Sequence, residues 1–369
     1  MSQAGDHCDE ISNSWKNALR GKQLTADIGL SGRVVDGNGT AAFGLNTPQF
    51  IAKPFFDPAS EALRFLPEGP RVLQQYPGHG GGGRKLGWLG IQHAAGTVQG
   101  SINVLDVQSR SNRTIPLPGR PGFFAETTRA GVVLIGLERR LVFCKLTTGE
   151  VEETGITVTD DERVIINDGL PIHGGVLFGT KHLECSQPVA ALYFFDACSR
   201  KVRMLIGGQT CSNGKFLRRD AEGFTLIDID STPKAIHRYQ FDAKLEHVIS
   251  QSLVVEPGSL PAFPDGLRSS PDGESVIVAF YDSGVIADGL ARQMHIGNGK
   301  VLCEWRIPGS PRVTCPEFVE LEGKVKVIFT TAVEGMPDET RRLAPGAGKL
   351  FIADTPFGNM PEPPPLLDV

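Results

Sequence analysis

Six similar segments follow one another along the chain, and their spacing is the feature that most restricts the fold. Each segment joins an apolar run to a second run rich in aromatic or β-branched residues, and an Asp- or Gly-containing turn follows. The apolar runs begin near residues 86, 131, 176, 224, 275 and 326, at steps of 45, 45, 48, 51 and 51 residues. Repeats of this length and type are typical of four-stranded propeller blades.

The repeat predicts an all-β fold, a six-bladed β-propeller with an N-terminal extension. One small sheet cannot bury both of its faces alone, so each blade needs its neighbours, and closing the ring protects the edges. Two β-sandwiches of roughly 180 residues each are the alternative. The even spacing argues against them, and no helical periodicity extends beyond about three turns, which disfavours α/β folds.

The repeats divide the chain into three parts. Residues 1–45 differ in composition from the rest and are expected to form an extension that is partly helical, near residues 11–20, or poorly ordered. Residues 46–361 are expected to form the propeller. Residues 362–369 are Pro-rich and are expected to form an extended C-terminal tail.

Composition and charge exclude several classes of partner. The net charge of −5 gives no electrostatic reason to expect nucleic acid. No run of 18 apolar residues occurs, so no membrane-spanning helix is expected, and the start of the chain lacks the pattern of a signal peptide. The seven cysteines form no C-x-x-C pattern and are expected to be mostly reduced. These features favour a cytoplasmic protein and leave the oligomeric state open.

Several common motifs are absent or lack the required context. Residues 78–83 satisfy the letters G-x-G-x-x-G, but a dinucleotide site needs a strand before the glycines and a helix after them. Here Pro77 precedes them and a strand-like run containing Trp88 follows, so a surface loop is expected. The chain has no G-x-S-x-G, H-E-x-x-H or Walker motif.

Three short triplets share one position within their segments. They are Asn167-Asp168-Gly169, Ser212-Asn213-Gly214 and Pro264-Asp265-Gly266. Alone, each would indicate a hairpin turn, as Pro271-Asp272-Gly273 does. However, the first three lie 9, 11 and 10 residues before the apolar runs that follow them. Equal phase in a propeller means equal height and equal distance from the axis, so their side chains are expected to converge.

A fourth position, Glu68 in Glu68-Gly69-Pro70, shares this phase once the loop at 78–83 is discounted. Glu68, Asn213 and Asp265 would together supply two carboxylates and one amide oxygen. Hard oxygen ligands of this kind suit calcium, magnesium or manganese, or zinc with additional waters. Two converging carboxylates repel each other unless a cation lies between them.

At these residues the chain resembles the family of gluconolactonase, regucalcin (senescence marker protein) and luciferin-regenerating enzyme, which are six-bladed propellers. The similarity covers roughly residues 55–361 and follows one order. Its motifs are Glu68-Gly-Pro, Leu117-Pro-Gly-Arg-Pro-Gly-Phe, Gly136-Leu-Glu-Arg-Arg-Leu, Asn167-Asp-Gly, Phe178-Gly-Thr, Ser212-Asn-Gly, Pro264-Asp-Gly, Pro308-Gly-Ser-Pro-Arg-Val-Thr-Cys and Phe329-Thr-Thr-Ala.

The resemblance implies one divalent metal ion, calcium or else zinc, magnesium or manganese, at the mouth of a central tunnel. Its ligands would be Glu68, Asn213 and Asp265, with Asn167 beside the metal. A Glu after F-G-T helps to position substrate in some members of the family, and Glu184 is the nearest match.

One departure bears on specificity. Sugar-lactone hydrolases of this family carry an Arg two residues before the Asn of N-D-G, and this chain has Ile165 there. The nearest arginine, Arg163, lies two residues earlier, which in a strand displaces a side chain by about 6–7 Å. An apolar wall at Ile165 would admit a more apolar lactone or ester, unless Arg163 replaces the missing group.

These features predict a metal-dependent lactonase acting on a sugar lactone or a more apolar one. The metal would polarise the carbonyl and activate water, and Asp265 would serve as general base or only as a ligand. Asn167 and Asn213 would orient substrate and metal. The alternatives are a fluorophosphatase-like phosphotriester hydrolase at the same site, or a non-catalytic propeller that binds a metabolite, a metal or a protein. The expected partner is a small-molecule lactone, with no nucleic acid and no membrane.

Overall fold

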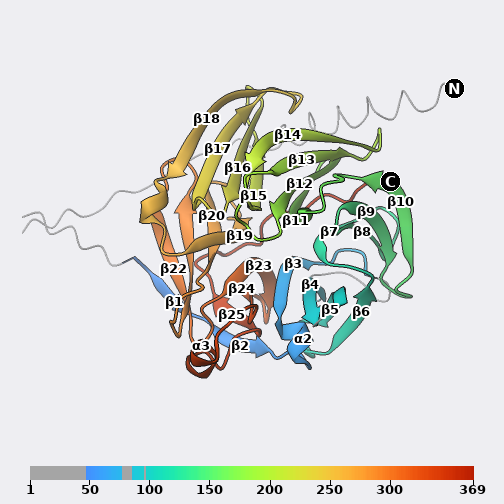
Figure 1. Ribbon diagram of the computed structural model, residues 1–369. Coiled ribbons are helices and arrows are strands. Elements are labelled where there is room, and N and C mark those ends of the chain that lie inside the picture. Colours follow the sequence, from blue (N-terminus) through green and yellow to red (C-terminus); the bar gives the residue numbers. More distant parts are fainter. Residues whose placement is uncertain (1–46, 77–84, 95–96) are drawn as a thin grey trace, which may run out of the picture. The chain divides into compact units, whose positions relative to one another are not determined.

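The computed structural model describes residues 47–76, 85–94 and 97–369, and residues 48–369 form one compact unit, a six-bladed β-propeller (Figure 1). The prediction of the fold class is therefore confirmed. The expected N-terminal extension, its helix and the G-x-G-x-x-G segment lie outside the described residues.

Each blade is an antiparallel sheet whose first strand lies nearest the propeller axis (Figure 1). Blade I contains β3 (Leu66–Val72), β4 (Lys85–Ala94), β5 (Thr97–Asp106) and β6 (Asn112–Leu117), and blade II contains β7 (Pro121–Glu126), β8 (Val132–Leu137), β9 (Arg140–Lys145) and β10 (Val151–Thr157). Blade III contains β11 (Val164–Ile172), β12 (Gly175–His182), β13 (Ala190–Asp196) and β14 (Lys201–Gln209), and blade IV contains β15 (Ser212–Arg219), β16 (Phe224–Asp230), β17 (Ala235–Phe241) and β18 (Val248–Val255). Blade V contains β19 (Phe263–Ser269), β20 (Ser275–Tyr281), β21 (Gly289–His295) and β22 (Val301–Ile307), and blade VI contains β23 (Val313–Leu321), β24 (Lys324–Thr331), β25 (Leu350–Asp354) and β2 (Lys53–Phe56).

The ring is closed by strands from the start of the described chain. β2 pairs antiparallel with β25 and forms the outer strand of blade VI, so this blade combines segments from both ends of the propeller. β1 (Gln49–Ile51) pairs in parallel with β22 and adds a fifth strand to blade V. Strands far apart in sequence thus complete one sheet, and this pairing joins the first and last blades of the ring.

The six apolar runs of the sequence are the second strands of the blades: β4, β8, β12, β16, β20 and β24. These strands lie inside the blades, and neighbouring blades cover both of their faces. β8, for example, is buried at all six positions. A separate hydrophobic cluster fills each of the six interfaces between blades. Between blades II and III, the ring centroids of Phe123 and Phe178 lie 5.4 Å apart. This two-sided burial explains why the runs are continuously apolar rather than alternating.

The three phased triplets lie within the innermost strands and not in turns. In all six innermost strands the pairing with the second strand shifts register at the same level, which marks a β-bulge. Glycine is required at this level because neighbouring blades approach closely. A Cβ on Gly214 would lie 2.5 Å from the backbone nitrogen of Leu267 in the next blade. By contrast, Pro271-Asp272-Gly273 is a turn, as predicted, closed by a hydrogen bond from Gly273 N to Ser270 O at 3.0 Å.

Elements outside the blades are short. They include α2 (Glu61–Arg64), the 3₁₀ turn η2 (Pro257–Ser259) and α3 (Asp338–Leu343). None of the described helices has the length and apolar character that crossing a membrane requires. The end of the chain packs on blade II, where Leu367 is buried and its backbone nitrogen donates to Glu126 O at 2.9 Å.

Candidate functional site

Side chains from the bulges of blades III, IV and V are connected by hydrogen bonds near the propeller axis. Asn167 Nδ2 donates to Asn213 Oδ1 at 2.8 Å and to Ser212 O at 3.0 Å. Asn213 Nδ2 donates to Ser231 Oγ at 2.8 Å, and this hydroxyl donates to Pro264 O at 2.6 Å, next to Asp265. The network fixes the two amide groups relative to the strand that carries Asp265.

Two carboxylates complete this level of the propeller. Asp265 is 8% exposed, and Glu68 is half-buried on β3. Burial raises the pKa of Glu68 to about 8, and Asp168 raises it further by charge repulsion. Burial also raises the pKa of Asp265 well above its ordinary value, and the neighbouring charge of Glu68 adds to this effect. Blade VI holds β3 in position next to Glu68, because Thr314 Oγ1 donates a hydrogen bond to Pro67 O at 2.7 Å.

Cations follow the bulge residues on the same inner strands. Lys215 is buried, donates to Asn213 O, and has the carboxylates of Asp168 and Asp228 each 3.9 Å from its nitrogen. On β19, Arg268 is paired with Glu317 at 3.0 Å. These cations are already engaged by other groups. Lys181 offsets part of the repulsion between Glu68 and Asp265, but the pKa values of both carboxylates remain raised.

This donor set fits a divalent metal ion. A half-buried and a buried carboxylate whose pKa values are both raised indicate a site with too little positive charge, and amide oxygens are ordinary additional ligands for a hard cation. Glu68, Asp265 and Asn213 lie on three different inner strands at the same bulge level. An exposed cluster of Asp242, Glu246 and His247 on the turn after β17 is separate from this site.

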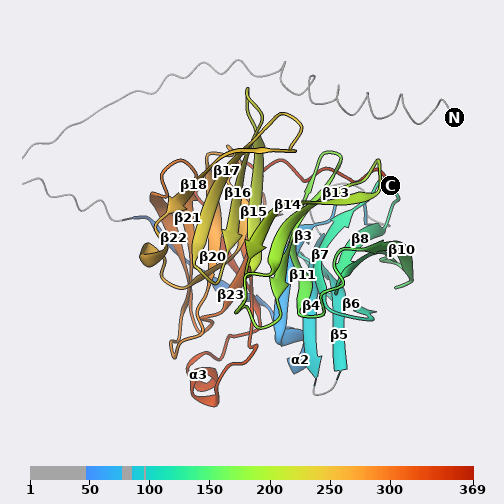
Figure 2. The same ribbon diagram turned by 45° about the horizontal axis from the view of Figure 1, so that its top comes forward.

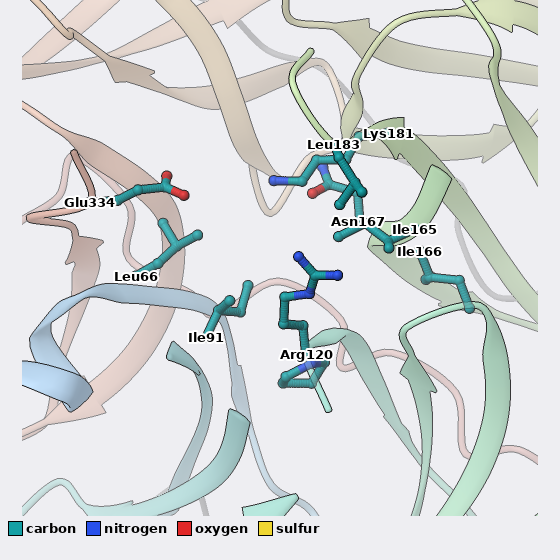
Figure 3. A pocket seen from close by; sticks show the side chains of 10 residues that line it. Leu66, Ile91, Arg120, Ile165, Ile166, Asn167, Lys181, Leu183 and Glu334 are labelled. Atoms are coloured by element: carbon teal, nitrogen blue, oxygen red, sulfur yellow. The ribbon is translucent and has the colours of Figure 1, made fainter. Parts of the chain in front are cut away.

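A pocket of about 100 Å³ borders this cluster (Figure 3). Asn167 is shared between the two. Apolar side chains form much of the wall: Leu66, Ile91, Pro121, Ile165, Ile166 and Leu183. Three charged side chains also line it. Lys181 and Glu334 point toward each other from opposite sides, and the guanidinium of Arg120 lies below Lys181 in this view (Figure 3).

The predicted substrate-binding residues divide into two groups. Ile165 is buried and lines the pocket, as does Asn167. Arg163 is exposed at the start of blade III, where its guanidinium binds Asp161 at 2.7 Å and Gln187 at 3.1 Å. Glu184 is exposed in the loop after β12. Neither Arg163 nor Glu184 lines the pocket. Arg163 therefore does not supply the positive charge that an arginine in place of Ile165 would supply.

None of the three charged pocket residues was identified from the sequence: Arg120, Lys181 and Glu334. Lys181 directly follows the Phe-Gly-Thr motif and pairs with Ile165 across β11 and β12. Arg120 precedes the first strand of blade II, and Glu334 follows β24. Arg120 lies inside one family motif and Lys181 directly follows another, and this was the sequence signal that could have identified them. Only the strand register shows which of these side chains become neighbours.

A pair of thiols lies beside the pocket. Cys185 and Cys211 are hydrogen-bonded to each other, and this bond lowers the pKa of Cys185 to about 7, with a further contribution from Lys181. Asn213 Nδ2 lies 3.7 Å from Cys211 Sγ, so the buried thiol also contacts the cluster. Among the described cysteines, Cys144, Cys185, Cys211, Cys303 and Cys315 are free thiols.

Comparison with known proteins agrees with this arrangement. The family model for the "SMP-30/Gluconolactonase/LRE-like region" matches residues 66–332. YvrE of Bacillus subtilis, which is named for a sugar lactone lactonase activity, is 28% identical over 186 residues. The match covers 50% of this chain and 60% of YvrE, so the chain spans less than two thirds of that relative.

Solved structures share the fold. Regucalcin from Agrobacterium tumefaciens, described as a calcium-binding protein, has a TM-score of 0.69 at 17% identity and covers 87% of this chain and 99% of its own. A luciferin-regenerating enzyme has a TM-score of 0.70 at 17% identity and covers 87% and 100%. At 17% identity these structures support the fold alone. The family model shows the family, because it matches most of the propeller, including the inner-strand motifs. The resemblance seen in the sequence is confirmed: the chain belongs to the SMP-30/gluconolactonase/LRE-like family.

Proposed function

We propose that this protein hydrolyses a lactone, and that Glu68, Asn213 and Asp265 hold a divalent metal ion for this reaction. The observation that carries the proposal is the pair of buried, mutually repelling carboxylates at one bulge level, beside a pocket in a chain of this family. When bound, such an ion supplies Lewis-acid stabilisation of the carbonyl oxygen as negative charge develops on it.

The residues of the chain have separate roles in this proposal. Asn167 borders both the pocket and Asn213, so its amide orients the lactone relative to the cluster. The Asp265 carboxylate either accepts the proton of the attacking water or serves only as a ligand of the ion, because a bound cation weakens a carboxylate as a base. Ile165 and its apolar neighbours exclude water from the ring substituents that they contact.

The test compares two aspartates that both occur in a Pro-Asp-Gly triplet. Asp265→Ala and Glu68→Ala should each lower kcat/KM on a lactone panel by about a hundredfold or more. Asp272→Ala should leave it unchanged, because Asp272 lies in a turn, where its carboxylate accepts from Ser270 Oγ and Glu274 N. A chelator should abolish wild-type activity reversibly, and circular dichroism should show that all variants are folded.

Three outcomes would contradict the proposal. Full lactone turnover in excess chelator, with metal loss verified by elemental analysis, would remove the metal from the reaction. Turnover of phosphotriesters but not of any lactone would favour the alternative hydrolase at the same site. An Asp272 variant as inactive as the Asp265 variant would show that the bulge and the turn had been wrongly distinguished.

A further inference from the structure

The pocket contains two cationic groups that the protein does not fully use. Lys181 Nζ forms no hydrogen bond or ion pair within the part of the chain that the structure describes. Arg120 is held by Glu138, which accepts from Nε at 3.0 Å and from Nη2 at 2.8 Å. Nη1 of Arg120 has no such partner among the described residues. Both free nitrogen groups face the pocket (Figure 3).

The other cations near the axis differ in this respect. Lys215 is engaged by Asn213 O and by two aspartates, and Arg268 by Glu317 and Pro70 O. These contacts make the inner cations part of the folded framework. Lys181 is therefore the lysine available to a ligand, and it is half-buried rather than fully solvated.

The position of Lys181 follows from strand register. In the ladder between β11 and β12, Lys181 is the direct partner of Ile165, and both side chains line the pocket. The wall that is apolar on β11 thus carries a positive charge on the adjacent strand. Leu183, two residues further along, lines the same pocket, and Glu334 and Asp265 act on the ammonium by charge attraction.

We propose that Lys181, with Arg120, determines specificity by binding a carboxylate carried on the lactone ring, so that the substrate is an otherwise apolar lactone bearing one carboxylate. A point charge and a partly free guanidinium form a clamp suited to two carboxylate oxygens. Ile165 and Leu183 contact the apolar remainder. Glu334 on the opposite wall accepts from Tyr281 at 3.4 Å and disfavours an anion on its own side, which orients the carboxylate toward Lys181. The inference rests on the proposed lactone hydrolysis.

The experiment uses a matched pair of probes with the metal-loaded full chain. One is γ-butyrolactone bearing a carboxylate on its γ carbon, and the other bears a carboxamide there. The wild type should favour the carboxylate in kcat/KM by about tenfold or more, since hydrogen bonds to charged groups exceed neutral ones. Lys181→Met should remove this preference, and Glu334→Gln should increase it. Lys201→Met, which removes an exposed lysine from β14 of the same blade, should change nothing.

Binding of the corresponding tetrahydrofuran carboxylate and carboxamide, which cannot be hydrolysed, is measured in parallel by calorimetry. If no lactone is hydrolysed, the proposed function fails. The assignment of Lys181 as a carboxylate-binding residue still stands if the tetrahydrofuran carboxylate binds more tightly than the carboxamide and Lys181→Met removes that difference. An unchanged preference in Lys181→Met would overturn the inference. So would an equal loss on both probes, which would place Lys181 at the reacting carbonyl. Lys181→Gln and thermal melting distinguish these outcomes from unfolding.

Discussion

The carboxylate pair of Glu68 and Asp265 predicts how the stability of the metal-free protein depends on pH. Both groups have pKa values raised by burial in the folded protein, so the folded state holds protons that the unfolded chain releases. Stability contributed by this proton uptake is complete below about pH 4.5 and is lost as the pH rises through about 8, the pKa of folded Glu68. A bound divalent cation should remove this dependence.

The expected size follows from Glu68 alone. A rise of its pKa from 4.5 to about 8 corresponds to roughly 5 kcal/mol for a fully buried group. Glu68 is only half-buried, so solvent screening reduces the free energy to about 2 kcal/mol. For a domain of this size, about 1 kcal/mol corresponds to roughly 2 °C in the melting temperature. The chelated protein should therefore melt about 4 °C lower at pH 8 than at pH 5 through this group.

Differential scanning calorimetry over this pH range, with chelator and with excess calcium, measures the effect. Glu68→Gln should flatten the pH profile of the chelated protein, whereas Glu150→Gln, at an exposed turn, should retain the wild-type profile. The comparison of variants isolates Glu68 from the other groups that titrate in the same range. Identical profiles for the wild type and Glu68→Gln, in the absence of metal, would show that the two carboxylates do not share one charged site.

Two further predictions concern the pocket wall. Ile165→Arg places a second cation directly opposite Lys181, and like charges paired across a ladder are destabilising. The single variant should lose thermal stability. Combined with Lys181→Met, it should shift the ratio of kcat/KM toward gluconolactone over an apolar γ-lactone by roughly 5- to 150-fold, and no shift would refute the role of this wall. Alkylation of Cys185 by iodoacetamide should reach half its maximal rate near pH 7, and Lys181→Met should move that midpoint to higher pH. Mass spectrometry of the labelled cysteine measures both, and a midpoint near that of an ordinary thiol would contradict the hydrogen bond between Cys185 and Cys211.

The blade repeat could be predicted because the second strands have an unusual environment. β8 and its equivalents are covered on both faces, and such strands are apolar at nearly every position. The outer strands gave a weaker signal. In β18, for example, six of the eight residues are exposed, and the alternation expected of a half-buried strand is missing. The repeat in the sequence therefore identified the two middle strands of each blade rather than all four.

The inner strands were harder to identify because their sequences resemble turns. Gly214 and Gly266 occur where a bulge brings one blade against the next, and a Cβ on Gly266 would lie 2.6 Å from Cys315 Sγ. The polar residues beside them face the axis. Glycine next to Asn or Asp is also the composition of a hairpin turn. The common phase of the triplets placed these residues at one level, although their composition alone gives no sign of a strand.

The pocket shows which information a sequence pattern lacks. Arg163 is the arginine nearest to Ile165 along the chain, which made it the expected replacement for the arginine that the resemblance implies at position 165. Arg163 lies two residues before Ile165 in the chain. Its side chain reaches the surface, where Asp161 and Gln187 bind the guanidinium.

Lys181 is 16 positions away in sequence but directly adjacent to Ile165 in space, because the two strands of a hairpin place such residues opposite each other. A charge can thus move from one strand to its partner while remaining on the same wall of a pocket. Such an exchange changes the direction from which the charge reaches the ligand and the length of the side chain that carries it. The loss of an arginine at Ile165 is therefore better read together with the gain of Lys181, as a change in which substituent of the lactone meets positive charge.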